Sequence, residues 1–261
     1  MRALCRLHRA GASPRARLTV TRPGADSQEQ LRIEDLANRY QLSDIASDQL
    51  LRLLELLVCD PLAPTALRDP TEVLERHLAD SLIALECVAA IRTASRIADL
   101  GAGAGAPGLP LAIALPEAEV ALVESQARKC RFIERTIVSC RVGNARCVHI
   151  RAESWRSGLG CFDMVTARAL ASLSVVAEYA APLLRVGGTL VAWRGRRDPQ
   201  AELAGAAAAS ALGLEVAAPI PVTPYLGSEH RHLHLMKKIC GTPARFPRRP
   251  GMAHKRPLGL S

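Results

Sequence analysis

Short apolar runs alternate with amphipathic segments through the middle of the chain. The apolar runs are 96–100, 119–124, 145–150, 162–168 and 188–193. Helical patterns separate them at 108–115, 126–141, 170–184 and 199–212. Apolar strands that alternate with helices are typical of a mainly parallel sheet with helices on both faces. Two later strands are predicted at 214–222 and 230–238, and the last could enter antiparallel. The pattern therefore predicts a doubly wound α/β domain over residues 96–240.

The residues before this domain predict a helical extension, residues 28–95. Leu31, Leu36 and Tyr40 fall on one helical stripe, and a second helical pattern runs over 50–58. The proline-rich segment 60–70 predicts an extended connector, because proline cannot lie inside a helix.

A further helix is predicted to begin directly after this connector. Asp69-Pro70-Thr71-Glu72 combines a capping residue, a proline in the first turn and a carboxylate at the third position. We expect the leucines of this helix to face the core; they are Leu74, Leu78, Leu82 and Leu85.

Charge is concentrated at the two ends of the chain. The net charge is +9, and residues 1–25 hold six arginines and no acid. Residues 241–261 hold five cations, also without an acid. We expect 1–27 to be a disordered basic tail and 241–261 to be an extended Pro/Arg-rich tail, with a charge that suits attraction to a phosphate backbone. Alternatively, both tails are solvated segments whose charge only keeps the protein in solution.

Several classes of protein are disfavoured by composition. No apolar stretch reaches the roughly 18 residues that a membrane-spanning helix needs. The eight cysteines form no C-x-x-C pair and no zinc-ligand spacing. We therefore expect a cytoplasmic monomer with reduced cysteines, no metal site and no membrane partner.

The candidate ligand site is a glycine-rich turn after the first predicted strand. Gly101, Gly103 and Gly105 would let the backbone approach a ligand closely. Glu124 ends the next strand, where a carboxylate can accept ribose hydroxyls. Ligands of such sheets lie at the carboxyl ends of the strands. This combination fits NAD and S-adenosylmethionine equally well.

The residues around the turn favour S-adenosylmethionine over a dinucleotide. Pro107 and Pro110 remove two amide donors that a pyrophosphate would use, and Asp99 would repel that pyrophosphate. S-adenosylmethionine has cationic ammonium and sulfonium groups, which Asp99 would attract. No Gly-Lys-Ser/Thr follows the glycines, so a P-loop is excluded.

Several segments resemble, in order and spacing, those of the RsmG (GidB) family. They are RHLADSL (76–82), IADLGAGAGAPGLPLAI (97–113), LVESQARKCRFIE (122–134), IRAESW (150–155), FDMVTARALASL (162–173) and RHLHLM (231–236). The ending PARFPRRPGMAHKRPL (243–258) is also similar to that family's C-terminal segment. The family methylates N7 of a guanine in 16S ribosomal RNA, so the resemblance implies this activity with S-adenosylmethionine as methyl donor.

The resemblance also implies cofactor contacts at particular residues. Gly101 and Ala106 lie in the glycine turn, although the family commonly has a bulkier apolar residue at 106. Ala152 and Glu153 would border the adenine, and Arg168 would be a further contact. Glu124 stands where the family carries its ribose acid.

No catalytic acid, base or nucleophile is expected. N7 of guanine has an in-plane lone pair and no proton at neutral pH, so the enzyme need only align the reactants. A methyltransferase with another substrate, an NAD-linked oxidoreductase and a non-catalytic RNA-binding assembly factor are the alternatives.

Cations near the strand ends are candidate RNA contacts. They include Arg128, Lys129 and Arg131 after Glu124, and Arg194, Arg196, Arg197 and Arg231 near the last strands. His77 and Asp80 share one helix face and either contact substrate or tie their helix to the glycine turn. We expect deletion of 243–261 to weaken RNA binding and to leave cofactor affinity intact.

Overall fold

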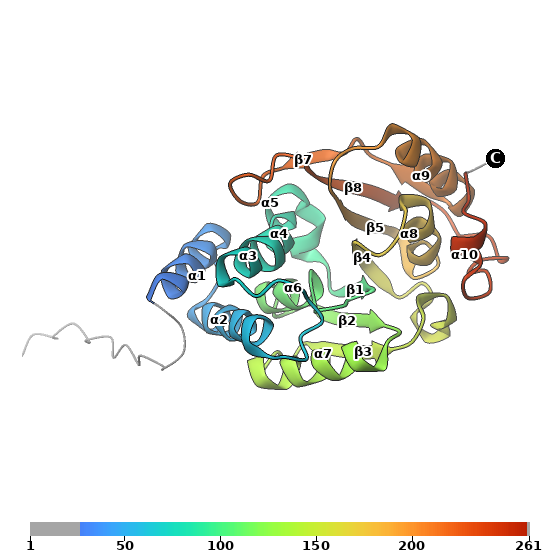
Figure 1. Ribbon diagram of the computed structural model, residues 1–261. Coiled ribbons are helices and arrows are strands. Elements are labelled where there is room, and N and C mark those ends of the chain that lie inside the picture. The colour runs from blue at the N-terminus through green and yellow to red at the C-terminus, as the bar shows by residue number, and fades with distance from the viewer. Residues whose placement is uncertain (1–26, 260–261) are drawn as a thin grey trace, which may run out of the picture.

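The computed structural model describes residues 27–259 as a mixed sheet between two groups of helices (Figure 1). The strands are β1 Arg96–Leu100, β2 Glu119–Glu124, β3 Ala145–His149, β4 Phe162–Arg168, β5 Leu184–Arg194, β6 Leu214–Val216, β7 Ile220–Val222 and β8 Arg231–Lys238. Their order is β3-β2-β1-β4-β5-β8-β6, and β7 also pairs with β8. Strands β1 to β5 pair in parallel, and β8 runs antiparallel to β5. The predicted doubly wound α/β fold is confirmed.

The helices divide between the two faces of the sheet. They are α1 Ser27–Tyr40, α2 Asp44–Cys59, α3 Pro70–Val73, α4 Asp80–Leu82, α5 Ala84–Cys87, α6 Gly108–Ala114, α7 Ala127–Cys140, α8 Leu173–Ala180, α9 Pro199–Leu212 and α10 Met252–Lys255. One core packs α1 to α7 on the sheet, and the other packs α8, α9 and α10 on the opposite face. None of these helices is long and apolar enough to cross a membrane.

The N-terminal extension forms the predicted helices, but the first of them does not bury all of the residues predicted for its core-facing side. Leu36 and Tyr40 are buried, but Leu31 is 60% exposed, so its predicted place on the stripe is wrong. Ile33 takes that place, because positions 33, 36 and 40 follow the helical period toward the core. The second helix begins after Ser43, whose side chain accepts a hydrogen bond from the Ala46 N–H.

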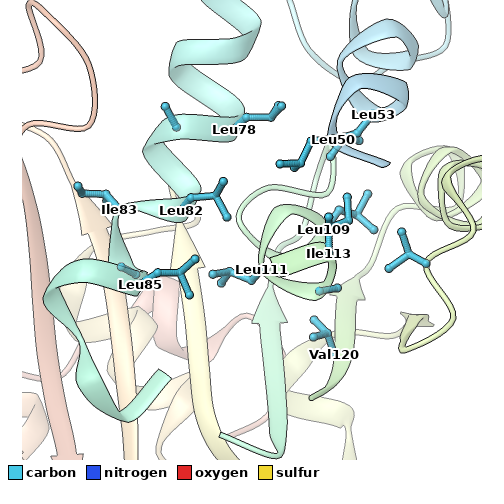
Figure 2. Packing of buried hydrophobic residues seen from close by; sticks show 14 of the residues in the cluster. Leu50, Leu53, Leu78, Leu82, Ile83, Leu85, Leu109, Leu111, Ile113 and Val120 are labelled. Carbon is cyan, nitrogen blue, oxygen red and sulfur yellow. The ribbon is translucent and has the colours of Figure 1, made fainter. Parts of the chain in front are cut away.

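The helix after the connector begins where the sequence predicts. Asp69 caps it by accepting a hydrogen bond from the Glu72 N–H, and Pro70 fills the first turn. A π-helical stretch, Leu74–Ala79, continues it toward α4. All four predicted leucines are buried, and Figure 2 shows Leu78, Leu82 and Leu85 against the leucines of α6.

The C-terminal segment, residues 243–258, differs from the predicted extended tail. It contains α10 and buries Phe246 and Ala253 against the core that includes α8. Arg248 also forms an ion pair with the buried Glu178 of α8. The segment therefore departs from the predicted extended tail at α10, and two apolar side chains and an ion pair with a buried carboxylate hold it on the domain. The predicted basic tail of residues 1–27 lies almost wholly outside the described residues.

The packing of the helical extension on the sheet can be tested at Leu82. Leu82→Ala removes a fully buried side chain and should lower the free energy of unfolding by about 2–5 kcal/mol. Leu31→Ala is the matched control, and it should change that free energy by less than about 0.5 kcal/mol because Leu31 is exposed. Urea unfolding measures both, and equal losses in the two variants would contradict the assigned burial.

Candidate functional site

The glycine turn after β1 depends on backbone angles that glycine adopts easily. Gly101, Gly103 and Gly105 have φ angles of +67°, +57° and +90°. A Cβ at Gly101 would lie 2.5 Å from Leu170 Cδ1. The turn is fastened to β2, because the Gly101 N–H donates to the Val123 carbonyl at 2.9 Å. The turn therefore lies at the carboxyl end of both strands.

Glu124 joins this turn to the loop that precedes α7. Its Oε2 accepts a hydrogen bond from the Gly103 N–H at 3.2 Å. Its Oε1 accepts from the Ser125 and Gln126 N–H groups at 2.7 and 2.8 Å. The side chain is only 5% exposed, so these amides supply the hydrogen bonds that a buried carboxylate requires. Oε2, with one amide donor, keeps a free lone pair for a ligand.

A cavity of about 300 Å³ opens beside Glu124, a volume at the small end of the range for ligand sites. Its lining residues are Gly101, Val123, Glu124, Ser125, Gln126, Lys129, Ile150, Arg151, Ala152, Glu153, Ala169, Leu170, Tyr179 and His254. They lie at the carboxyl ends of β1, β2, β3 and β4, with additions from α7, α8 and α10. The cavity therefore lies at the strand ends, where the sheet topology predicts a ligand.

Only part of the predicted cofactor set lines this cavity. Gly101, Glu124, Ala152 and Glu153 do so. The others lie outside the lining within the described part of the chain; they are Asp99, Gly103, Gly105, Ala106 and Arg168. Gly103 contributes through its hydrogen bond to Glu124.

Asp99, predicted to attract a cationic ligand, is buried and does not line the cavity. It is 0% exposed and accepts hydrogen bonds from Thr166 Oγ1 at 2.9 Å and from the Gly108 N–H at 3.0 Å. Burial raises the pKa of Asp99 to about 7, against the lowering effect of those two hydrogen bonds. Its role is to fasten the start of α6 and β4 to the glycine turn.

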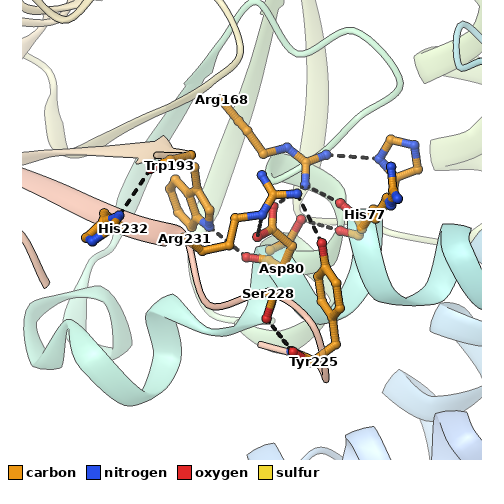
Figure 3. A network of polar contacts seen from close by, with 11 residues as sticks. His77, Asp80, Arg168, Trp193, Tyr225, Ser228, Arg231 and His232 are labelled. Atoms are coloured by element: carbon orange, nitrogen blue, oxygen red, sulfur yellow. Dashed lines mark hydrogen bonds and ion pairs between the residues drawn. The ribbon is translucent and has the colours of Figure 1, made fainter. Parts of the chain in front are cut away.

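Arg168, predicted to contact the cofactor, is held by the N-terminal extension instead (Figure 3). Its guanidinium donates to Asp80 Oδ2 at 2.9 Å, to the Arg76 carbonyl at 2.7 Å and to His77 Nδ1 at 2.9 Å. Asp80 is 1% exposed, so a cation must compensate its charge. This ion pair holds the Arg168 guanidinium at the extension, and Arg168 is not among the residues that line the cavity.

The predicted substrate candidates His77, Asp80 and Arg231 belong to the same network. His77 accepts from Arg168 at Nδ1, so its Nε2 carries the proton and donates to Thr65 Oγ1. Burial, with Arg168 nearby, lowers the pKa of His77 to about 4. Arg231 lies 3.7 Å from Asp80 Oδ1 and donates to the Tyr225 hydroxyl. The network ties the extension to Arg168 at the end of β4 and Arg231 at the start of β8, whereas the structural alternative had placed this tie at the glycine turn.

Of the two predicted cation clusters, only the one on α7 contributes a residue to the cavity lining. Lys129 lines the cavity, and Arg128 and Arg131 are exposed nearby on α7. Arg194 instead donates to the Ala171 carbonyl at 2.7 Å, and Arg197 pairs with Glu202. The cations of α7 are therefore better placed for a ligand of this cavity than those after β5.

Five polar residues of the lining were not predicted from the sequence; they are Ser125, Gln126, Arg151, Tyr179 and His254. Arg151 precedes the predicted Ala152 and could have been found from the strand-end rule. Tyr179 lies near the end of α8 and His254 lies in α10, where no strand end marks them. Burial and the adjacent Glu153 carboxylate raise the pKa of Tyr179.

The cavity is lined by carboxylates and cations. Among the described residues, no group of three or more His, Cys, Asp or Glu side chains could hold a metal ion. The cysteines there are all free. The donor set can bind a polar ligand with hydroxyl groups and a flat apolar part, because carboxylates stand beside Val123, Ile150 and Leu170.

Comparison with known proteins gives one consistent result. The family model for "rRNA small subunit methyltransferase G" (GidB) matches residues 59–223. A protein of this name from Chloroflexus aggregans is 43% identical over 74% of this chain and 82% of its own length. Another, from Desulfitobacterium hafniense, is 34% identical over 90% of this chain and 96% of its own length.

One solved structure resembles the fold over most of its own length. It is an S-adenosylmethionine-dependent methyltransferase from Aquifex aeolicus, with a TM-score of 0.52. It covers 64% of this chain and 93% of its own, at 13% identity. This similarity shows a shared fold.

The protonation of Asp99 can be tested by pH-dependent unfolding. The carboxyl group ionises near pH 4 in an unfolded chain but near pH 7 in the fold, so its contribution to stability is lost as pH rises through about 7. Asp99→Asn can keep both hydrogen bonds, donating to Thr166 and accepting from Gly108, without an ionisable group. Between pH 4 and 8 the wild type should therefore lose a few kcal/mol of unfolding free energy relative to the variant. A difference between the two proteins that does not change with pH would contradict this.

Proposed function

The chain belongs to the rRNA small subunit methyltransferase G (RsmG, or GidB) family, and from this membership we propose that it methylates N7 of a guanine in 16S ribosomal RNA. S-adenosylmethionine supplies the methyl group, on a sulfonium from which it can be transferred directly. The guanine N7 attacks with its own lone pair, so no residue of the chain needs to remove a proton.

The residues around the cavity suit this methyl donor. The free lone pair of Glu124 Oε2 can accept a hydrogen bond from a ribose hydroxyl. Oε1 already accepts two amides, so Glu124 would bind mainly through one oxygen, a narrower role than its position in the sequence suggests. Beyond it, Ile150, Ala152 and Glu153 offer an apolar wall and a carboxylate for the adenine. The position of Glu124 between the glycine turn and the cavity carries the proposal.

The chain's contribution to the reaction is alignment. Holding nucleophile and methyl donor in line can supply about 7–11 kcal/mol of the barrier reduction. The glycine turn, Glu124 and the residues after β3 would fix the donor, and Ala169 and Leu170 after β4 would border the reacting atoms. The buried Arg168–Asp80 pair would keep the loop after β4 in place without contacting the reactants.

RNA binding is assigned to cations on the same side as the cavity. Lys129 and Arg151 line it, and Arg128 is exposed on α7, so all three can meet phosphates near a bound guanine. N7 lies in the deep, narrow major groove of A-form RNA, which side chains cannot enter. The target guanine must therefore be in a loop or in RNA that is still open during assembly of the small subunit.

The role of Glu124 can be tested with Glu124→Gln. The glutamine NH2 group would face the Gly103 N–H or the Ser125 and Gln126 N–H groups, which need a hydrogen-bond acceptor. The substitution would also remove the charge-assisted hydrogen bond to the ribose. Affinity for S-adenosylmethionine should fall about 10- to 100-fold, measured by calorimetric titration. Affinity for 16S RNA should not change. A variant that binds the methyl donor normally but loses RNA would remove Glu124 from the cofactor site.

The activity itself is tested by methyl transfer. Labelled S-adenosylmethionine is incubated with the full chain and small ribosomal subunits that lack the modification, and with naked 16S RNA in parallel. The label should appear as N7-methylguanosine at one position. Label at another atom or in protein would contradict the proposal. Binding of NADH instead of S-adenosylmethionine would favour an oxidoreductase.

A further inference from the structure

The C-terminal segment reaches the cavity from a part of the chain beyond the last strand. His254 of α10 lines the cavity together with Glu153 and Tyr179. Its ring centroid lies 6.1 Å from that of Tyr179, with the ring planes tilted by 59°. His254 thus lines the same cavity as the residues that follow β3.

Three contacts fix the position of this segment. The Gly251 N–H donates to Glu153 Oε1 at 3.0 Å. Arg248 Nε donates to Glu178 Oε1 at 2.7 Å, and Glu178 is only 2% exposed. Phe246 and Ala253 are buried in the core that includes α8. A buried carboxylate that loses its cation is strongly unfavourable, so the Arg248–Glu178 pair holds the segment against the domain.

We propose that this C-terminal segment completes the cofactor site, with His254 as a contact for the adenine and Gly251 as the residue that positions Glu153. The inference rests on the proposed function, in which the ribose lies at Glu124 after β2. A purine attached to that ribose extends toward the end of β3, where Ala152, Glu153 and His254 lie. An imidazole at this wall offers a flat face or edge to the base. Deletion of the segment should therefore weaken cofactor binding, contrary to the expectation from sequence.

The test is calorimetric titration of S-adenosylhomocysteine into the full chain and into His254→Ala. Loss of one aromatic contact should weaken binding about two- to tenfold. Lys255→Ala is the matched control, because Lys255 is the exposed neighbour on the same helix and does not line the cavity as the structure describes it. It should bind as the wild type does. Thermal unfolding of both variants should match the wild type, because both side chains are exposed.

A second variant removes residues 243–261 and tests the positioning of Glu153. It should bind more weakly than His254→Ala, because Glu153 loses its Gly251 donor as well. Affinity equal to the wild type in both His254→Ala and the truncated chain would overturn the inference while leaving the proposed function intact. Failure of the full chain itself to bind S-adenosylhomocysteine would overturn both.

Discussion

The hydrogen bonds of the buried Glu124 carboxylate determine the shape of the site. A carboxylate that is 5% exposed must be satisfied by donors, and Glu124 takes amides from the glycine turn and from the loop before α7. These two loops follow different strands, so one side chain fixes their separation. The cavity lies between them with its geometry already set. A ligand that uses Glu124 would therefore bind to a site that needs little rearrangement.

Two buried ion pairs attach the flanking segments to the methyltransferase domain. Asp80 with Arg168 joins the N-terminal extension to the end of β4, and Glu178 with Arg248 joins the C-terminal segment to α8. Each carboxylate is at most 2% exposed, so removal of its partner would cost about 3–5 kcal/mol. The first pair involves α4 on one face of the sheet, and the second involves α8 on the other face. The segments on either side of the domain thus belong to the architecture of the site.

The sequence predicted the elements well because the period of apolar residues reports burial directly. It also located Gly101, Glu124, Ala152 and Glu153, since these follow strands or match the family's segments. It did not indicate the partners of buried polar side chains, because these partners lie far away in the sequence. Arg168 turns to Asp80, which lies 88 residues away in the chain, and Asp99 turns to Thr166 on the neighbouring strand. His254 carried no local signal, because only the folded C-terminal segment brings it to the cavity.

A crystal structure of the full chain with S-adenosylhomocysteine would show whether the cavity beside Glu124 is the cofactor site. We expect a ribose hydroxyl within hydrogen-bonding distance of Glu124 Oε2 and an adenine beside Ala152 and Glu153. A bound molecule elsewhere on the protein, or one whose ribose makes no contact with Glu124, would show that this cavity does not bind the cofactor in the proposed way.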